Sequence, residues 1–87
     1  MKLQQLRYLR EVAKRGLNLS EAAEALHTSQ PGISKQIRQL EDELGVDILV
    51  RNGKRVVAVT EPGRAILGIA ERLLQDAENL RDRKSVV

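Results

Sequence analysis

Apolar residues near the start of the chain recur every three or four positions. An α-helix gathers such positions on one face, so this spacing predicts an amphipathic helix over residues 3–13. Lys14-Arg15-Gly16 should end it, because cations stabilise a helix C-terminus and glycine tolerates the left-handed cap. The positions that share the spacing are Leu3, Leu6, Leu9, Val12 and Ala13.

A short second helix is predicted over the alanine-rich residues 21–26. Asn18 or Ser20 can cap it, because either side chain accepts a hydrogen bond from a free N–H of the first turn. His27 predicts the turn that follows, since histidine enters positive φ more readily than most residues.

A third helix is predicted from Ser29, which can cap it, to Gly45, which ends it. Pro31 falls in the first turn, where its missing N–H costs nothing. The expected buried stripe of this helix is Ile33, Ile37, Leu40 and Leu44.

The pattern then changes to two β-prone runs, residues 48–50 and 56–59. The pair Asn52-Gly53 between them predicts a tight hairpin turn. The intervening residues are Arg51, Asn52, Gly53, Lys54 and Arg55, so the turn carries three bases and no acid.

A last helix is predicted from Thr60, its cap, to about Arg83, with Pro62 in the first turn. Its apolar seam is longer than packing onto a small domain requires, which favours pairing with a second copy. Near Ile66 and Leu67 the helix could instead lie across its own domain. The expected dimer contacts are Ile66, Ala70, Leu73, Ala77 and Leu80, flanked by Ile69 and Leu74.

The fold class predicted by these elements is mainly α with a small β-hairpin. Residues 1–60 would form a winged helix-turn-helix domain, and residues 61–87 a long linker and dimerisation helix. In a helix-turn-helix, the second helix of the pair presents its N-terminal side chains to the DNA major groove.

Composition narrows the function classes. The 87 residues are 41% hydrophobic and 31% charged, which is ordinary for a soluble globular domain, and Tyr8 is the only aromatic residue. The chain has no cysteine, one histidine and no glycine-rich phosphate loop, so we expect neither an enzyme, nor a cofactor, nor a metal site. Neither a signal peptide nor a membrane span of about 20 apolar residues is visible, and a cytoplasmic protein is expected.

The third helix offers side chains suited to DNA. Gln30 can pair with adenine and Lys35 with guanine, while Pro31 and Gly32 keep the leading edge of the helix low. Hydroxyl groups and free helix N–H groups bind phosphates, which assigns Ser29, Ser34 and Arg38 to the backbone. The alternative is a solvated polar face, which we prefer for Gln39 and Asp42. The acidic run 41–43 should lie away from DNA.

The hairpin turn is a second basic contact, for the DNA backbone or the adjoining minor groove. Alone, its charges would be explained equally well as protection of the strand edges. The basic helix just before it favours the DNA interpretation.

The chain resembles the N-terminal domain of LysR-type transcriptional regulators along essentially its whole length. The stretch that carries the resemblance is Ser29-Gln30-Pro31-Gly32-Ile33-Ser34-Lys35-Gln36-Ile37-Arg38, followed by Leu40-Glu41, Leu44-Gly45, Arg51 and Thr60-x-x-Gly63. Residues 1–8 and 28–35 look most like the subgroup that controls sulfate assimilation and cysteine biosynthesis. Val50 departs from the pattern, since an aromatic residue is usual there.

This resemblance implies a cytoplasmic regulator that binds double-stranded promoter DNA as a dimer or tetramer. It implies base contacts by Gln30, Pro31, Gly32 and Lys35, and phosphate contacts by Thr28, Ser34, Arg38 and the hairpin turn. A small-molecule inducer, an acetylated serine in the sulfur subgroup, would act through an effector domain after the linker helix. We expect that domain to be missing from this chain, and therefore no ligand site.

Two rivals remain. In a protein-interaction module, the last helix would bind a partner and the basic residues would be incidental. An RNA-binding winged helix is less favoured, because Tyr8 alone cannot supply the aromatic stacking that such proteins use.

Overall fold

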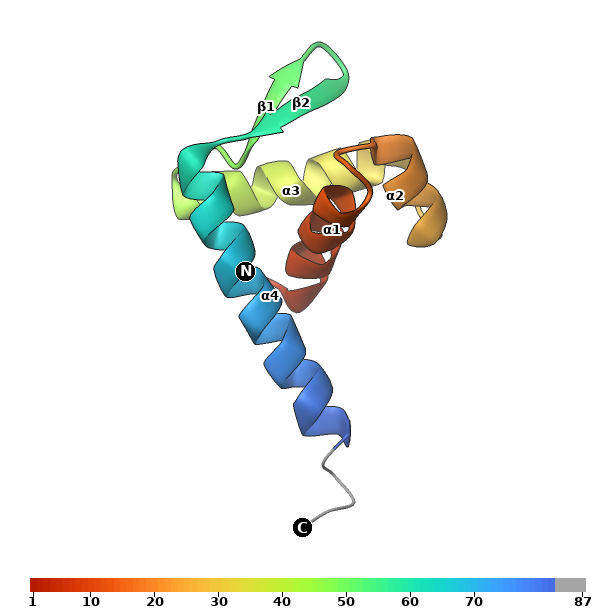
Figure 1. The fold of residues 1–87 in the computed structure, drawn as a ribbon. Helices are drawn as coiled ribbons and strands as arrows, with labels where there is room; N and C mark the ends of the chain where they lie inside the picture. The colour runs from red at the N-terminus through yellow and green to blue at the C-terminus, as the bar shows by residue number, and fades with distance from the viewer. Residues whose placement is uncertain (83–87) are drawn as a thin grey trace.

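The computed structural model describes residues 1–82 and contains four helices and one two-stranded antiparallel sheet (Figure 1). The predicted fold class, mainly α with a small hairpin, is confirmed. The elements are α1 (Leu3–Lys14), α2 (Leu19–Ala25), α3 (Gln30–Leu44), β1 (Leu49–Asn52), β2 (Arg55–Val59) and α4 (Glu61–Asp82). Within the described residues, no helix is long and apolar enough to cross a membrane.

Helix α1 lies at the centre and packs against each of the other three helices (Figure 1). The core between them is aliphatic, as the composition predicts, and Leu9, Val12 and Ile48 are fully buried. Helix α3 contributes Ile33, Ile37 and Leu40, all without exposed surface. The prediction that Leu44 completes this stripe is wrong: Leu44 is 39% exposed, because the last turn of α3 extends past α1.

The helix ends follow the expected chemistry. Asn18 caps α2 by accepting a hydrogen bond from the N–H of Glu21 at 3.0 Å. Ser29 caps α3 by accepting one from the N–H of Gly32 at 3.1 Å. His27 has a φ of 54° in the turn between these helices, which confirms its predicted role. The chain thus reverses sharply between α2 and α3, as a helix-turn-helix requires.

The hairpin is shifted by one residue from the predicted turn. Asn52 pairs with Arg55, so the two-residue loop is Gly53-Lys54 and not Asn52-Gly53. Gly53 has a φ of 64° in the first loop position, where type II′ turns favour glycine. The register also slips between Val50 and Arg51, which leaves an extra residue in the opposite strand and makes a β-bulge.

Helix α4 begins tightly against the base of the hairpin and then runs away from the helical body (Figure 1). Thr60 caps it through the N–H of Gly63 at 2.9 Å, as expected. A Cβ on Gly63 would stand 2.4 Å from the carbonyl oxygen of Ile48, so only glycine fits this close approach. The predicted end near Arg83 lies outside the described residues.

The apolar seam of α4 divides between two faces. Ala70 and Leu74 are each 1% exposed and belong to the core beside α1. The prediction of Ala70 as a dimer contact is therefore wrong, because its own domain already covers it. Ile66 is partly buried against the same core, as the alternative for the first half of the helix anticipated.

Candidate nucleic-acid interface

The N-terminal half of α3 presents the side chains that the sequence assigns to DNA. Gln30, Pro31, Lys35 and Arg38 are exposed, whereas Ile33 and Ile37 between them are buried. Helical spacing thus separates an inward apolar face from an outward polar one. Gly32 and Ser34 are half-buried on the flank of that outward face, as is Thr28 just before the helix.

Ser29 and Gly32 are bound into the start of the helix. The Ser29 hydroxyl oxygen accepts the Gly32 N–H as the cap of α3. A Cβ on Gly32 would lie 3.0 Å from that oxygen and 3.2 Å from the Thr28 hydroxyl oxygen. A side chain at this position would therefore crowd the cap, and glycine keeps the leading edge of the helix low.

Gln30 is held by a residue that sequence reasoning did not assign to the site. Its side-chain amide donates a hydrogen bond to the hydroxyl oxygen of Ser20 on α2, at 2.7 Å. The carbonyl oxygen and the second N–H of that amide remain available. An amide with one free donor and one free acceptor can form the bidentate pair that reads adenine.

A groove of about 460 Å³ separates α3 from the hairpin. The residues that line it include three bases and no acid: Leu19, Gln30, Pro31, Ser34, Arg38, Arg51, Gly53 and Lys54. Exposed Asp42 lies toward the other end of α3, beside Gly45 and Asp47. Charge is therefore segregated along one helix, and the basic end faces the groove.

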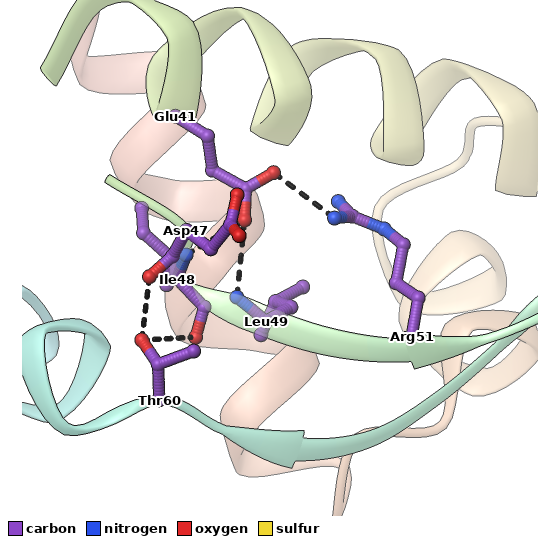
Figure 2. A network of polar contacts seen from close by, with 6 residues as sticks. All are labelled: Glu41, Asp47, Ile48, Leu49, Arg51 and Thr60. Carbon is purple, nitrogen blue, oxygen red and sulfur yellow. Dashed lines mark hydrogen bonds and ion pairs between the residues drawn. The ribbon is translucent and has the colours of Figure 1, made fainter. Parts of the chain in front are cut away.

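Arg51 differs from the other residues of the predicted wing. Its side chain is only 15% exposed and donates a hydrogen bond from Nη1 to Oε1 of Glu41 at 3.0 Å (Figure 2). Its Nε and Nη2 groups are buried and have no partner among the described protein atoms. The rest of the turn, from Asn52 to Arg55, is exposed and forms what we call the hairpin tip.

Glu41 is the centre of this contact network (Figure 2). It is 6% exposed, and its Oε2 accepts hydrogen bonds from the backbone N–H of Ile48 at 2.7 Å and of Leu49 at 3.1 Å. Burial alone would raise the pKa of Glu41, but the bonds from Leu49, Ile48 and Arg51 outweigh burial and hold that pKa below its ordinary value. A carboxylate in the acidic run thus joins α3 to the hairpin.

Sequence patterning could not find this role for Glu41, because an acid beside Asp42 and Glu43 has the pattern of a solvated surface. The available signal was its spacing: Glu41 lies four residues after buried Ile37, so the two share one face of α3. Asp42 and Glu43 are exposed at the end of α3 away from the groove, as expected for the acidic run.

The model of the "Bacterial regulatory helix-turn-helix protein, lysR family" matches residues 3–64. Two similar proteins from Burkholderia cenocepacia are the HTH-type transcriptional regulators SsuR and CysB, each 58% identical over 81 residues. The regulator cbl of Escherichia coli is 56% identical over 81 residues. Each alignment covers 93% of this chain and 26% of the relative. The chain thus spans about a quarter of the length of these relatives.

Solved structures agree with these relatives. A CbnR_DBD-DNA complex superposes with a TM-score of 0.88 at 40% identity, covering 99% of this chain and 97% of that one. A BenM_DBD complex with catB site 1 DNA gives 0.88 at 32% identity, covering 98% and 89%. A crystal structure of CbnR, described as a LysR family transcriptional regulator, gives 0.86 at 40% identity over 98% of this chain and 29% of that one.

The match extends from α1 through the recognition pair and the hairpin into the start of α4, so it includes every element around the groove. The expected family is confirmed. The chain belongs to the LysR family of bacterial regulatory helix-turn-helix proteins.

Proposed function

We propose that this domain binds double-stranded DNA sequence-specifically, as the DNA-binding part of a LysR-type transcription regulator acting in the cytoplasm. The observation that carries the proposal is the groove between α3 and the hairpin, which bases line and acids avoid. A recognition helix in the major groove with a basic hairpin beside it fits the negative charge of the duplex. A regulator of this kind binds DNA and catalyses no reaction.

The roles of the side chains follow from their placement. Gln30, Pro31, Gly32 and Lys35 face the base edges, and Thr28, Ser29, Ser34 and Arg38 contact phosphates. At the hairpin tip, Asn52, Gly53, Lys54 and Arg55 contact the neighbouring backbone or minor groove. We leave Arg51 out of this set, because its guanidinium is turned toward Glu41.

We also propose that α4 pairs with α4 of a second copy, residues 61–87 acting as linker and dimerisation helix after a DNA-binding domain of residues 1–60. Support comes from exposed apolar side chains on the face turned away from α1: Ile69 is 48% exposed, Leu73 41% and Leu80 76%. Ala77 is half-buried between Leu73 and Leu80 along the helix. Two such domains would read half-sites about one turn of DNA apart.

The biological role is inferred from the relatives. SsuR, CysB and cbl are named as transcriptional regulators, and our sequence reasoning assigns the chain to the sulfate and cysteine subgroup. We therefore propose target promoters of sulfur-assimilation genes. An inducer such as an acetylated serine would bind through a further domain and not through this one.

The test is recovery of bound fragments from sheared genomic DNA by the purified domain, followed by sequencing. Enrichment of a few promoters that share an imperfect dyad would support the proposal, and sulfur genes among them would support the subgroup. Replacing Lys35 and Arg38 with Ala should abolish enrichment and leave self-association intact. Lys14→Ala, a change to an exposed base at the end of α1, serves as the control.

If no fragment binds at any salt concentration, the proposed function is wrong and the protein-interaction module becomes the better explanation. Uniform recovery that disappears as salt rises would mean backbone contacts alone, with a log–log slope of about −0.9 per neutralised phosphate. Self-association has its own test. Leu73→Glu with Leu80→Glu should give a monomer in sedimentation equilibrium, whereas Gln75→Glu should not.

A further inference from the structure

The hairpin is attached to the helical body differently from the helices. The four helices pack against one another, whereas the two strands chiefly contact each other. Apolar anchoring is confined to the hairpin base, where Ile48 is fully buried and Leu49 is 4% exposed. Packing therefore fixes the base of the hairpin and leaves its direction to other contacts.

Glu41 supplies those contacts on the α3 side. One carboxylate binds the backbone N–H groups of Ile48 and Leu49 and the guanidinium of Arg51, at 2.7, 3.1 and 3.0 Å. These donors follow one another along the start of the hairpin (Figure 2). A group held at three points along a strand cannot pivot about any one of them.

Two further features make the direction of the hairpin sensitive to Arg51. The β-bulge lies between Val50 and Arg51, and a bulge bends its strands and increases their twist. On the other side of the base, the Thr60 hydroxyl donates to the carbonyl oxygen of Asp47 at 2.5 Å, and the Thr60 N–H donates to that of Ile48 at 2.9 Å. The base is thus clamped from α3 and from the start of α4, and the Glu41–Arg51 pair is the contact nearest the tip.

We propose that Glu41 is a positioning residue for DNA binding, which through Arg51 sets the direction in which the hairpin tip meets the duplex. The inference rests on the proposed function, since it concerns how the same interface is built. Its consequence is that an acid on the recognition helix strengthens binding to a polyanion. Lys54 and Arg55 reach phosphates only while this carboxylate holds the strand that leads to them.

The test uses the opposite signs expected of a charge effect and a positioning effect. Glu41→Gln and Asp42→Asn each remove one negative charge from the same part of α3. By charge alone, both variants would bind DNA more tightly. We expect Glu41→Gln to bind about tenfold more weakly and to flatten the salt dependence by up to two phosphates, at about 0.9 in slope for each. Asp42→Asn should bind as well as wild type or slightly better.

A double-mutant cycle separates positioning from a general loss of structure. In a background carrying Lys54→Ala and Arg55→Ala, the tip has no cation left to position, so Glu41→Gln should cause no further loss. Arg51→Met provides a second route if Glu41→Gln fails to fold, because it leaves the backbone hydrogen bonds of Glu41 in place. It should weaken binding in the wild-type background and not in the background without tip cations.

Circular dichroism at the binding temperature identifies the folded variants, and fluorescence anisotropy with a fixed promoter fragment measures affinity. Equal gains in affinity for Glu41→Gln and Asp42→Asn would overturn the positioning role. Equal losses for Glu41→Gln in both backgrounds would overturn it as well, since these would reflect stability alone. If wild type itself does not bind, the proposed function fails before this inference is reached.

Discussion

Helices α3 and α4 are both amphipathic, yet they leave opposite kinds of surface uncovered. In α3 the apolar positions Ile33, Ile37 and Leu40 are fully buried, and its exposed face is polar and basic near the N-terminus. In α4 only Ala70 and Leu74 among the apolar side chains are buried, while Leu73 and Leu80 remain exposed.

The difference indicates what each face is suited to contact. A polar face with Lys35 and Arg38 can exchange water for phosphates and base edges, whereas exposed leucines at helical spacing gain most by meeting other apolar side chains. One small core therefore supports two interfaces, one for DNA and one for a second copy. It does so because α3 satisfies its apolar stripe within the domain and α4 does not.

The largest expected effect contrasts the two apolar faces directly. Ile37→Ala should reduce the free energy of unfolding by about 2–5 kcal/mol, because it opens a cavity among fully buried side chains. Leu80→Ala should change it by no more than about 0.5 kcal/mol at concentrations where the chain is monomeric. Urea denaturation followed by circular dichroism measures both. Similar losses would mean that the distal part of α4 packs on its own domain.

A second comparison lies within α4, between two glycines. Gly63→Ala should destabilise the domain by about 1–3 kcal/mol, because its Cβ would meet the backbone oxygen of Ile48 at 2.4 Å. Gly68→Ala has open space within 4 Å and should stabilise the helix by about 0.5–1 kcal/mol. Thermal melts of the two variants should therefore move in opposite directions, and a shared direction would contradict the close contact at the start of α4.

Much of the fold could be predicted from local chemistry. Apolar spacing located the long helices, and Asn18, Ser29 and His27 marked where two of them begin or turn. The hairpin was expected, but its loop was displaced by one residue, because the bulge shifts the register and puts Gly53 in the first loop position.

The site was predictable where it depends on one helix and not where it depends on two elements. Lys35 and Arg38 face outward simply because Ile33 and Ile37 face inward. The roles of Glu41, Arg51 and Ser20 could not be derived, since each depends on a partner distant in the sequence. Ala70 illustrates the same limit, because the seam that it shares with Leu73 does not show which half α1 will cover.

A smaller effect tests the acid end of α3. Because the pKa of Glu41 is below its ordinary value of 4.5 in the folded chain, the unfolded chain binds more protons between the two values. The stabilisation by Glu41 is therefore complete above pH 4.5 and is lost as the pH falls through the lower, folded-state pKa. The difference in Tm between wild type and Glu41→Gln should shrink over that range.

Asp42→Asn removes the same charge from an exposed position and corrects for the general effect of charge on acid unfolding. Against this control, a gap between wild type and Glu41→Gln that stayed constant down to acid unfolding would show that ionised Glu41 is not what stabilises the hairpin base.

The smallest expected effect concerns how well the polar face of α3 is organised before DNA arrives. Ser20 holds the Gln30 amide at 2.7 Å, so one N–H of that amide is already oriented when the helix enters the groove. Ser20→Ala frees the side chain, and ordering it again on binding costs about 0.5–1.5 kcal/mol. Discrimination at the base pair facing Gln30 should therefore fall by less than about tenfold, while the salt dependence stays unchanged because no phosphate contact is lost. Ser20→Thr keeps the hydroxyl and should restore discrimination, and in a Gln30→Ala background Ser20→Ala should have no effect. Competition between promoter fragments that differ at single base pairs measures this, and an altered salt slope for Ser20→Ala would instead identify Ser20 as a phosphate contact in its own right.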